Sequence, residues 1–428
     1  MLQLWGYKAG ERSEQLVYAY LPEYRKIKYN VDMLNMTYEY KLEPTTVQVA
    51  TFEQWLVVCR KVWNYSLRER KDWYNSRSCL VNACSLRSEY IIPADAPRPN
   101  FAVQCKSLTE ARQSNPELQS VHSQVLQQVL KQLEKAFTSM WETGFGFPRF
   151  KKAGRMRSFL FPTPKKQTII GNQIDLPMIG RVKFRQSRPI PDGFVVKQVR
   201  IVKRASGYFA MLVLQCDVEI PKATPHDHAL GIDLGLEKFL ATSDYELVPR
   251  PRFFVDAQGK LKLLQQKLKH KKLGSKNWRK AQQKVARHHQ HISDSRKDFH
   301  FKTAHHLCDQ AGMIFAEDLN LKAMSRGMLC KHTLDAGFGQ FLSILEYVCF
   351  KRGVAFLKVD PNGTSQICPN CKTHTGKKPL SLRVHSCPEC GYETDRDVAA
   401  AQVVAQRGLA AVGLTVKMLS EGKVIRLP

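Results

Sequence analysis

The chain has 428 residues, of which 43% are hydrophobic and 10% aromatic, so it can bury a sizeable core and should form about two or three domains. Its 66 Lys and Arg outnumber its 38 Asp and Glu, and the formal net charge of +28 indicates a polyanionic partner. Nucleic acid is the favoured partner and an anionic membrane surface the rival, although no run of about 18 apolar residues predicts a membrane-spanning helix.

Residues 1–12 contain no charged segment followed by an apolar one, which argues against a secretory signal. We therefore expect a reducing, cytoplasmic compartment, in which the 12 cysteines are thiols or metal ligands rather than disulfides. Eight of them show no paired spacing and are interpreted as small buried hydrophobic residues. They are Cys59, Cys79, Cys84, Cys105, Cys216, Cys308, Cys330 and Cys349.

The N-terminal third is predicted to begin with an extension, residues 1–33, followed by a strand in MTYEYKLEPT; Met33 or Met36 could equally be the true start. Apolar residues at helical spacing predict a helix from Phe52 to Lys71. A second helix is predicted through SVHSQVLQQVLKQLEKAFTSMW, with Ser120 as its N-cap. Its buried face is predicted to be either Val121, Val125 and Val129 or Leu126, Leu130 and Leu133.

After residue 141 the pattern changes to short strands separated by turns, which predicts a small basic β-barrel. The dipeptides Gly171-Asn172 and Ser206-Gly207 are typical of hairpin turns between alternating segments. Residues 221–228, PKATPHDH, are predicted to be a linker.

The C-terminal half alternates strands with helices, which predicts a mixed sheet with a covering layer. Strands are expected in ALGIDLG, in KFLATSD as its hairpin partner, in MIFAEDL and in GVAFLKVD. One or two long basic helices are expected over 258–298, broken near Gly274, followed by a helix in KTAHHLCDQAG that ends at Gly312. Two more helices are expected, in FGQFLSILEYVCFKRG up to Gly353 and in RDVAAAQVVAQRGL at the end of the chain.

Three acidic residues are candidates for one metal-dependent catalytic site. Asp233 alternates with the apolar residues of a buried strand, so its carboxylate points to the opposite face, and Glu317 ends a second apolar strand. Asp397 opens the last helix. Carboxylates at strand ends and a helix start can meet at two Mg²⁺ ions about 3.5–4 Å apart, which hydrolyse phosphodiesters and prefer oxygen ligands.

Each acid has a plainer interpretation when it is taken alone. Glu317 could be a solvated strand end, and Asp397 a carboxylate favoured by the helix dipole. GIDLG also occurs in the phosphate loops of actin-like ATPases, but those loops continue with Gly-Thr, whereas this chain continues with Leu-Glu-Lys. The nuclease interpretation is favoured by the set of three, with Asp395 as a weaker candidate for the third ligand.

Two Cys-x2-Cys pairs, separated by residues 372–386, predict one structural zinc ion in a closed tetrahedral site. The four ligands are Cys368, Cys371, Cys387 and Cys390. The neighbouring His374 and His385 could compete as ligands but are interpreted as surface residues.

Two segments combine cations with aromatic residues, a pattern typical of contacts to nucleic-acid phosphates and bases. Residues 260–297 contain 13 Lys or Arg and one acid, Asp294, and GFPRFKK alternates Phe with cations. The alternative is a merely solvated face. The predicted nucleic-acid contacts are Arg149, Lys151, Lys152, Lys271, Lys272, Trp278 and Arg279.

The chain resembles the TnpB family of transposon-encoded RNA-guided DNA endonucleases, which are related to type V CRISPR effectors. The resemblance rests on an ordered set of motifs that covers most of residues 34–428, while residues 1–33 have no counterpart. These motifs are GFPRFKK, GIDLGLEKFLATSD, SRKDFHFKTAHHL, FAEDLNLKAM, TSQICPNC and SCPECGYETDRDVAAAQV. One position departs from the family: Ala399 stands where the family usually carries Asn.

The resemblance implies a fold of α/β and β-barrel parts. It implies a wedge-like β-barrel (34–50 and 141–225) split by a helical recognition insert (51–140). It further implies a RuvC-type nuclease of RNase H-like fold (226–365 and 393–428) around a zinc ribbon (366–392). The family's catalytic acids fall on Asp233, Glu317 and Asp397.

The implied function is DNA cleavage directed by a guide RNA from the transposon end and by a short DNA motif beside a double-stranded target. A prokaryotic, nucleoid-associated monomer is expected. The alternative from another class is an RNA-guided DNA-binding repressor or targeting protein with weak or no cleavage. A transposase is disfavoured, because no Tyr or Ser stands in a recombinase-like context.

Overall fold

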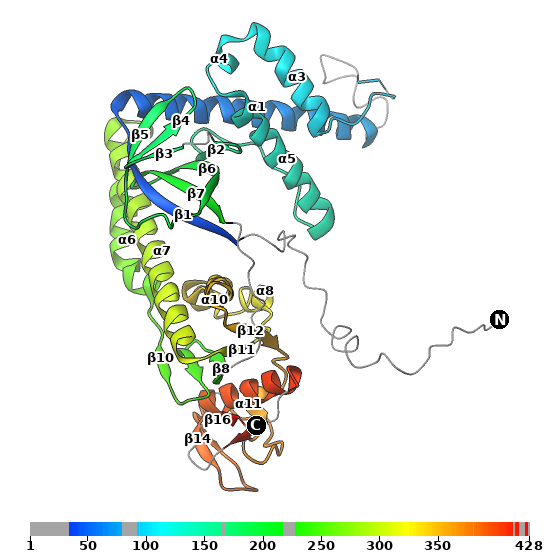
Figure 1. Ribbon diagram of the computed structural model, residues 1–428, viewed down its shortest axis with the longest axis vertical. Helices are drawn as coiled ribbons and strands as arrows, with labels where there is room; N and C mark the ends of the chain where they lie inside the picture. Colours follow the sequence, from blue (N-terminus) through cyan, green and yellow to red (C-terminus); the bar gives the residue numbers. More distant parts are fainter. Residues whose placement is uncertain are drawn as a thin grey trace, which may run out of the picture. The chain divides into compact units, whose positions relative to one another are not determined.

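The structure is a computed structural model that describes residues 34–78, 92–93, 95–164, 168–216, 227–379, 381–413, 416–418 and 424–426 (Figure 1). The chain forms two compact units, Met1–Ile220 and Pro221–Pro428. The predicted extension 1–33 and most of the predicted linker 221–228 lie outside the described residues. Within the described ranges, no helix is long and apolar enough to cross a membrane.

The first unit is built on a seven-stranded, fully antiparallel sheet that forms a half-barrel. The strand order is β2-β6-β7-β1-β5-β4-β3, so the first strand of the chain pairs in the middle of the sheet. The strands are β1 (Leu34–Glu43), β2 (Ser158–Phe161), β3 (Ile169–Ile170), β4 (Gln173–Leu176), β5 (Gly180–Arg185), β6 (Val195–Arg204) and β7 (Gly207–Cys216). Both predicted hairpins are present, with Gly171 at φ 56° and Gly207 at φ 129°.

Four helices of the described part of the chain lie between β1 and β2, and so between two strands of one sheet. They are α1 (Thr46–Ser78), α3 (Phe101–Ser114), α4 (Pro116–Gln119) and α5 (Ser123–Thr143). The first predicted helix is longer at both ends than expected. Both candidate faces of α5 are buried, because Val125 and Val129 and the three Leu side chains all contribute to the core.

The predicted N-cap of α5 is wrong. Ser120 caps the C-terminus of α4 instead, and α5 begins at Ser123 after His122, which makes no side-chain capping bond. The Pro-containing turn α4 intervenes because Asn115 caps its N-terminus through the backbone N–H groups of Glu117 and Leu118. This short helix lies immediately before the segment that was predicted as a helix, and Ser120 ends it.

The second unit contains a five-stranded mixed sheet of order β10-β9-β8-β11-β12. Its strands are β8 (Ala229–Leu234), β9 (Lys238–Thr242), β10 (Leu247–Pro249), β11 (Met313–Glu317) and β12 (Ala355–Val359). The β8–β9–β10 meander is antiparallel, whereas β11 pairs in parallel with both β8 and β12. All four strands predicted here are therefore present.

The predicted helices of this unit are present in the predicted order, and several further elements were not predicted. The helix expected in KTAHHLCDQAG is the end of one 35-residue helix, α7, and the short helices α8 and α9 were not predicted. A β-hairpin, β15–β16, follows the helix that was expected to be last. The elements are α6 (Phe253–Lys269), α7 (Lys276–Gln310), α8 (Leu321–Met324), α9 (Cys330–Ala336), α10 (Phe338–Arg352), η1 (Thr364–Gln366), β13 (Val384–Ser386), β14 (Glu393–Asp395), α11 (Arg396–Ala411), β15 (Val416–Met418) and β16 (Val424–Arg426).

Half of the described cysteines outside the Cys-x2-Cys pairs fit their interpretation as small buried residues. Cys59, Cys308 and Cys349 are buried free thiols, Cys105, Cys216 and Cys330 are partly exposed, and Cys79 and Cys84 lie outside the described residues.

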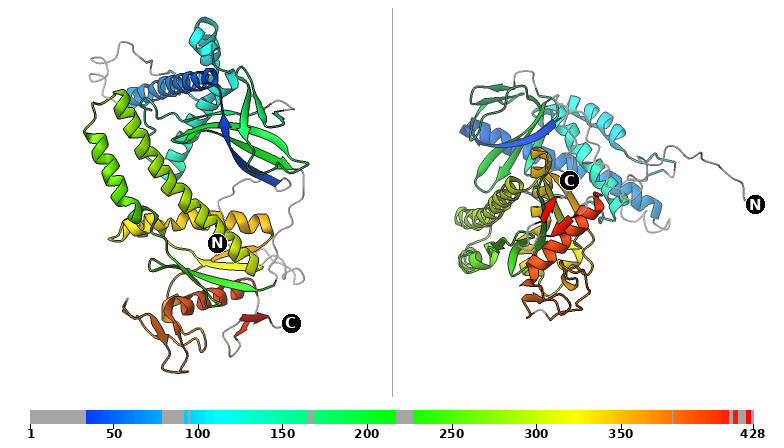
Figure 2. Two further views of the ribbon diagram at one scale, coloured as in Figure 1. Left: turned by 90° about the vertical axis from the view of Figure 1, so that its left-hand side faces the viewer. Right: turned by 60° about the horizontal axis from the view of Figure 1, so that its bottom comes forward.

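The five-stranded sheet is covered on both faces. Leu230, Ile232, Ile314 and Ala316 point into a core shared with α7 and α10. The opposite face, which carries Phe315, packs against α11 (Figures 1 and 2). The sequence of a strand that is buried on both faces is a nearly continuous run of hydrophobic residues, as in MIFAE.

Helix α11 approaches the sheet closely because glycine occupies the contact points. A Cβ on Gly231 would lie 2.1 Å from the Ala401 carbonyl oxygen, and a Cβ on Gly408 would lie 2.1 Å from the Phe315 ring. Three consecutive alanines, 399–401, keep the buried face of the helix small. The spacing between α11 and β8 therefore has no room for a larger side chain.

We predict that Gly231→Ala lowers the stability of the protein by about 1–3 kcal/mol or more, because the added methyl group collides with the α11 backbone. Gly259→Ala is the matched control: it lies exposed inside α6 with open space around it, and it should stabilise the helix by about 0.5–1 kcal/mol. Urea unfolding of the two variants measures both effects. An unchanged midpoint for Gly231→Ala would contradict the close packing.

Candidate functional site

Asp233 and Glu317 lie next to each other on neighbouring parallel strands. The last paired residues of β8 and β11 are Ile232 and Ala316, and each acid is the next residue along its strand. Paired residues of parallel strands share a face, so both carboxylates point to the face covered by α11. Glu317 is 8% exposed, and its Oε1 accepts a hydrogen bond of 2.6 Å from the Thr364 hydroxyl.

Helix α11 brings Asp397 to the same corner of the sheet. Asp397 lies one helical turn before Ala401 on α11. Ala401 contacts Gly231, which lies two residues before Asp233 and on the same face of β8. Asp397 is in the first turn of the helix and is partly buried. The three acids predicted from the sequence are therefore brought together from three separate segments.

Burial and mutual repulsion act on this cluster. Burial raises the pKa of Asp233 well above its ordinary value, and the charges of Glu317 and Asp397 raise it further. Burial also raises the pKa of Glu317, although the Thr364 hydrogen bond opposes this, and burial followed by the charge of Asp395 raises the pKa of Asp397. Within the described ranges none of the three forms an ion pair with Lys or Arg, so a cation would relieve the repulsion.

Asp395, the weaker candidate for the third ligand, is engaged elsewhere. Its Oδ1 accepts the N–H of Asp397 at 2.9 Å as the N-cap of α11, and its Oδ2 accepts from Lys238 Nζ at 2.6 Å. Burial alone would raise the pKa of Asp395, but these hydrogen bonds lower it below its ordinary value. Asp395 therefore supports the start of α11, and Asp397 is the better candidate for a metal ligand.

The donor set suits Mg²⁺, which binds carboxylate oxygens at about 2.0–2.1 Å. Among the described residues only the four zinc-type cysteines have ligand atoms all within 4.8 Å of one another, so the three acids do not form so tight a group. Two ions about 4 Å apart do not require this, because ligands at opposite ends of the pair can lie about 8 Å apart.

We predict that Asp233→Asn raises the melting temperature in Mg²⁺-free buffer at neutral pH, because it removes a partly buried charge that two other acids repel. A carboxyl whose pKa is raised in the folded state stabilises the fold when protonated, and this contribution is lost as pH rises through the raised pKa. The difference in melting temperature between the variant and the wild type should therefore become smaller as the pH falls below neutrality.

The exposed neighbour Asp318→Asn is the control and should change little. Thermal unfolding measures the differences, at about 2–4 °C per kcal/mol for a unit of this size. Magnesium is omitted by gel filtration rather than by a chelator, because a chelator would also remove zinc. A difference in melting temperature that stays constant across the pH series would show that the charge of Asp233 does not destabilise the fold.

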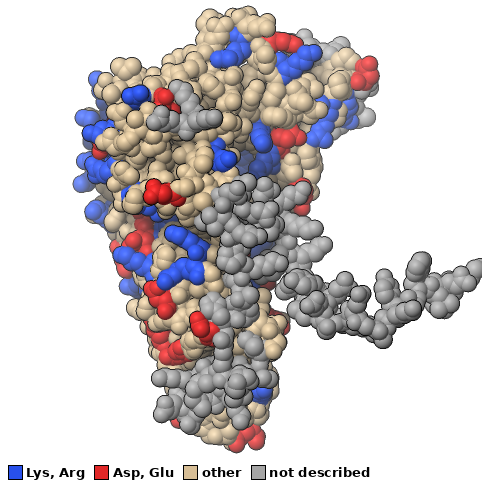
Figure 3. All heavy atoms as spheres, viewed as in Figure 1, with Lys and Arg blue, Asp and Glu red and all other residues tan. Residues whose placement is uncertain are grey.

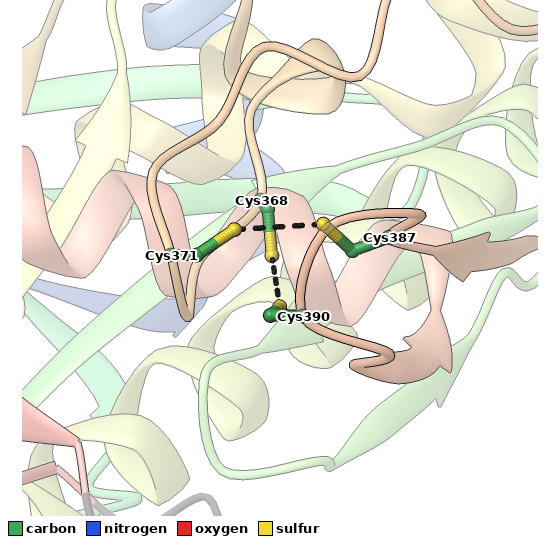
Figure 4. A group of neighbouring side chains, drawn as sticks. All are labelled: Cys368, Cys371, Cys387 and Cys390. Atoms are coloured by element: carbon green, nitrogen blue, oxygen red, sulfur yellow. Dashed lines mark hydrogen bonds between the residues drawn. The ribbon is translucent and has the colours of Figure 1, made fainter.

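The four predicted zinc ligands converge from two loops (Figure 4). Their sulfur atoms all lie within 4.8 Å of one another, with 3.7 Å between Cys368 and Cys390 and 3.5 Å between Cys371 and Cys387. Four sulfurs at about 2.3 Å from one tetrahedral Zn²⁺ lie about 3.8 Å apart, so the group fits zinc. His385 is buried beside Lys378 and is not one of the four, contrary to its interpretation as a surface residue.

The two loops have the same backbone conformation. In each, the residue after the second cysteine has a positive φ, 65° for Lys372 and 70° for Gly391. In each, that residue donates its N–H to the carbonyl of the first cysteine, at 2.9 Å to Cys368 and 3.0 Å to Cys387. Two equal turns that face one sulfur cluster are typical of a zinc ribbon.

We predict that Cys387→Ser releases zinc and lowers the melting temperature, because binding of structural zinc contributes directly to folding. Cys330→Ser is the control, since that free thiol lies outside the cluster. Elemental analysis should find about one zinc per wild-type chain and per control chain, and none in Cys387→Ser. A wild-type protein that is purified without metal and melts at the same temperature after zinc addition would contradict the assignment.

Helices α6 and α7 pack against each other as a hairpin whose turn contains Gly274 at φ 79°, as predicted (Figure 2). Lys271 and Lys272 are exposed in this turn, and Trp278 and Arg279 occupy the first turn of α7. Figure 3 shows Lys and Arg gathered along the side where Figure 1 places α6. All four predicted contacts on this hairpin therefore lie close to one another at its tip.

The GFPRFKK loop of the first unit exposes aromatic side chains. Phe147 is 40% exposed and Phe150 45% exposed, Phe145 just before the motif is 68% exposed, and Arg149 and Lys152 are also exposed. Lys151 differs, because its ammonium group lies 3.6 Å from the centre of the Trp63 ring and burial lowers its pKa. Its backbone also exchanges two hydrogen bonds with Asn64, which anchors the loop to α1.

Several supporting residues had no signal in the sequence. Lys238 contacts Asp395 and Thr364 contacts Glu317 only through the folded chain, and Gln402 joins α11 to Ser243 in the same way. Arg98, whose guanidinium lies 4.2 Å from the centre of the exposed Trp141 ring, extends the aromatic surface of the first unit. A cavity of about 350 Å³ between α1, α3 and α4 contains none of the predicted site residues.

Family models match three stretches of the chain. The OrfB_IS605 model, described as "Probable transposase", matches residues 212–328, and the "Cas12f1-like, TNB domain" model matches residues 338–404. A third, described as "Helix-turn-helix domain", matches residues 33–79. In this structure that third range contains β1 and the single helix α1 rather than two helices joined by a turn.

Two curated relatives match nearly the whole chain. A "Putative RNA-guided DNA endonuclease" of Streptomyces pristinaespiralis is 29% identical over 89% of this chain and 91% of its own length. The "Putative RNA-guided DNA endonuclease InsQ" of Escherichia coli is 28% identical over 91% of this chain and 96% of its own length. These matches, with those to the family models, confirm the resemblance to the TnpB family.

Two solved structures are also similar to the chain, at lower sequence identity. A Cas12f1–sgRNA–target DNA complex covers 87% of this chain and 99% of its own, with a TM-score of 0.34 and 14% identity. A mini-RNA-guided endonuclease, CRISPR-Cas_phi3, covers 89% of this chain and 93% of its own, with a TM-score of 0.39 and 9% identity.

Proposed function

We propose that this TnpB-like chain is an RNA-guided DNA endonuclease that hydrolyses target phosphodiesters at the cluster of Asp233, Glu317 and Asp397. The observation that carries the proposal is the convergence of these three buried or half-buried acids, without a neutralising Lys or Arg in ion-pair contact among the described residues. Divalent cations would neutralise such a cluster. The raised pKa of each acid means that its negative charge is unfavourable in the folded protein unless a cation binds.

When bound, two Mg²⁺ ions would activate a water nucleophile and stabilise the leaving oxygen of the phosphodiester. Asp233, Glu317 and Asp397 would hold them. Thr364 orients the Glu317 carboxylate through its 2.6 Å hydrogen bond, and Asp395 holds the start of α11 through its N-cap bond and its ion pair with Lys238. The mixed sheet with an acid at the end of β8 and β11 supports a RuvC-type domain of RNase H-like fold.

Guide RNA and double-stranded DNA are the proposed partners, with a short flanking DNA motif required. The names of the two curated relatives support this, and so does the net charge of +28. The exposed cations at the tip of the α6–α7 hairpin would contact phosphates, and the aromatic rings of the GFPRFKK loop would stack on unpaired bases. We propose Arg149, Lys152, Lys271, Lys272, Trp278 and Arg279 as these contacts, with Lys151 in the supporting role that its packing indicates.

The domain division proposed is a wedge-like half-barrel over 34–50 and 141–225, with a helical recognition insert over 51–140. The nuclease domain comprises 226–365 and 393–428, and the zinc ribbon 366–392. The helices between β1 and β2, and the cysteine cluster between β12 and α11, support this division.

A second candidate is guided DNA binding with weak or no cleavage. Ala399 favours it, because this residue is only 1% exposed and replaces the Asn usual in the family, so a polar group is missing two residues after Asp397. All three acids are nevertheless present, and a protein selected only for binding has no need to keep them buried together at an electrostatic cost.

We predict that Asp233→Ala abolishes cleavage while the protein still binds guide RNA and target DNA, because Asp233 is not one of the exposed residues proposed to contact nucleic acid and its carboxylate is on the sheet face covered by α11. The RNA that copurifies with the wild-type protein is sequenced first and then used to design a matching DNA target. Gel analysis measures cleavage with Mg²⁺, and a shift assay measures binding.

Asp318→Asn is the control and should cut at the wild-type rate. Cleavage by Asp233→Ala at that same rate would refute the assignment of the site. A wild-type protein that binds the target specifically but leaves it intact would establish the second candidate.

A further inference from the structure

Gln402 and Ser243 are polar residues that lie fully buried between α11 and the five-stranded sheet, each with 0% exposure. Neither belongs to the acid cluster or to the zinc site. A buried amide costs free energy unless its donors and acceptors are paired, so the partners of Gln402 indicate what this residue does.

Gln402 joins the sheet at one end of its side chain. Its Nε2 donates to the Ser243 carbonyl oxygen at 3.4 Å. Ser243 in turn holds Gly231 through two bonds: its Oγ accepts the Gly231 N–H at 3.1 Å, and its own N–H donates to the Gly231 carbonyl at 2.9 Å. Gly231 is two residues before Asp233 in β8.

The other end of the side chain joins the zinc ribbon. Gln402 Oε1 accepts a hydrogen bond of 2.9 Å from the Tyr392 hydroxyl. The backbone carbonyl of Tyr392 accepts the N–H of the zinc ligand Cys387 at 3.0 Å. A continuous path of polar contacts therefore runs from the cysteine cluster through Tyr392, Gln402 and Ser243 to the strand that carries Asp233.

This path is separate from the covalent one. Along the chain the ribbon leads from Cys390 through β14 to Asp397, and so controls one acid of the cluster. The polar path crosses α11 and reaches β8, and so controls another. With both connections intact, the ribbon fixes the two sides of the cluster relative to each other.

We propose that Tyr392 and Gln402 are positioning residues that couple the zinc ribbon to β8 and thereby set the position of Asp233 relative to Asp397. The proposal depends on the proposed function only in the experiments that measure DNA cleavage. The physical basis is that loss of the Tyr392 hydroxyl leaves the buried Gln402 Oε1 without its donor, so the amide must rearrange or loosen α11 from the sheet.

The test compares two Tyr→Phe substitutions on the same hydrogen-bond chain. Tyr392→Phe removes the bond to Gln402, whereas Tyr245→Phe removes a bond at the exposed end, because the Tyr245 hydroxyl lies 2.9 Å from that of Tyr392. In the full-length protein with guide RNA, Tyr392→Phe should raise the Mg²⁺ concentration for half-maximal cleavage by about fivefold or more. Tyr245→Phe should leave that concentration unchanged, and both variants should keep one zinc per chain.

A double-mutant cycle with Gln402→Met tests whether the two residues act as one path. If they do, Tyr392→Phe adds little to the defect of Gln402→Met. Hydrogen–deuterium exchange of a peptide covering 229–234 gives a readout that needs no activity, and exchange should be faster in Tyr392→Phe and Gln402→Met but not in Tyr245→Phe.

Equal Mg²⁺ dependence and equal exchange in Tyr392→Phe and Tyr245→Phe would overturn the proposal, and so would full additivity in the cycle. A lower melting temperature without either change would show a merely structural role and would also overturn it. If the wild-type protein does not respond to Mg²⁺, the proposed function fails, and the exchange data alone then decide whether the coupling exists.

Discussion

The contact between α11 and the sheet is the constraint on which the candidate site depends. Because Gly231 and Gly408 have no side chain, α11 and the sheet lie closer together than a methyl group at either position would allow. Because Asp397 precedes this contact by about one turn and Asp233 follows Gly231 by two residues, the close approach is what brings the two acids to one place. A larger residue at either glycine would separate the acids without altering any of them.

Close packing also creates the electrostatic condition of the site. The same helix that excludes solvent from Asp233 delivers a second negative charge to it, so burial and repulsion raise its pKa together. The ion pair of Lys238 with Asp395 supports the helix start rather than neutralising the cluster. A second pair, Glu237 with Arg383, joins the same β8–β9 turn to the ribbon. These two salt bridges thus join the elements around the cluster, while the three acids have no such partner among the described residues and can bind a cation.

Local patterns in the sequence were sufficient for the parts of this design that are local. Alternation in GIDLG predicted which way Asp233 points, and the spacing of four cysteines predicted the cluster that Figure 4 shows. The cap of α5 was wrong because Ser120 ends the preceding Asn-capped turn, α4, and α5 begins only at Ser123. Lys238, Thr364 and Gln402 escaped prediction because their partners are 47 to 159 residues away in the chain, where no periodicity relates them.

The zinc ribbon lies in the chain between two supports of the acid cluster, and this position gives it a mechanical role. Thr364, which holds Glu317, precedes Cys368 by four residues, and Asp395, which caps α11, follows Cys390 by five. A metal that ties Cys368 to Cys390 therefore shortens the connection between these supports from a 30-residue excursion to a few bonded residues on each side, which restricts their relative motion. Helix α11 completes the connection, since Gln406 donates to the Pro369 carbonyl at 2.6 Å and Arg407 to those of Asp360 and Asn362. Glu317 and Asp397 are thus positioned by one closed circuit of contacts, of which the zinc site is a member.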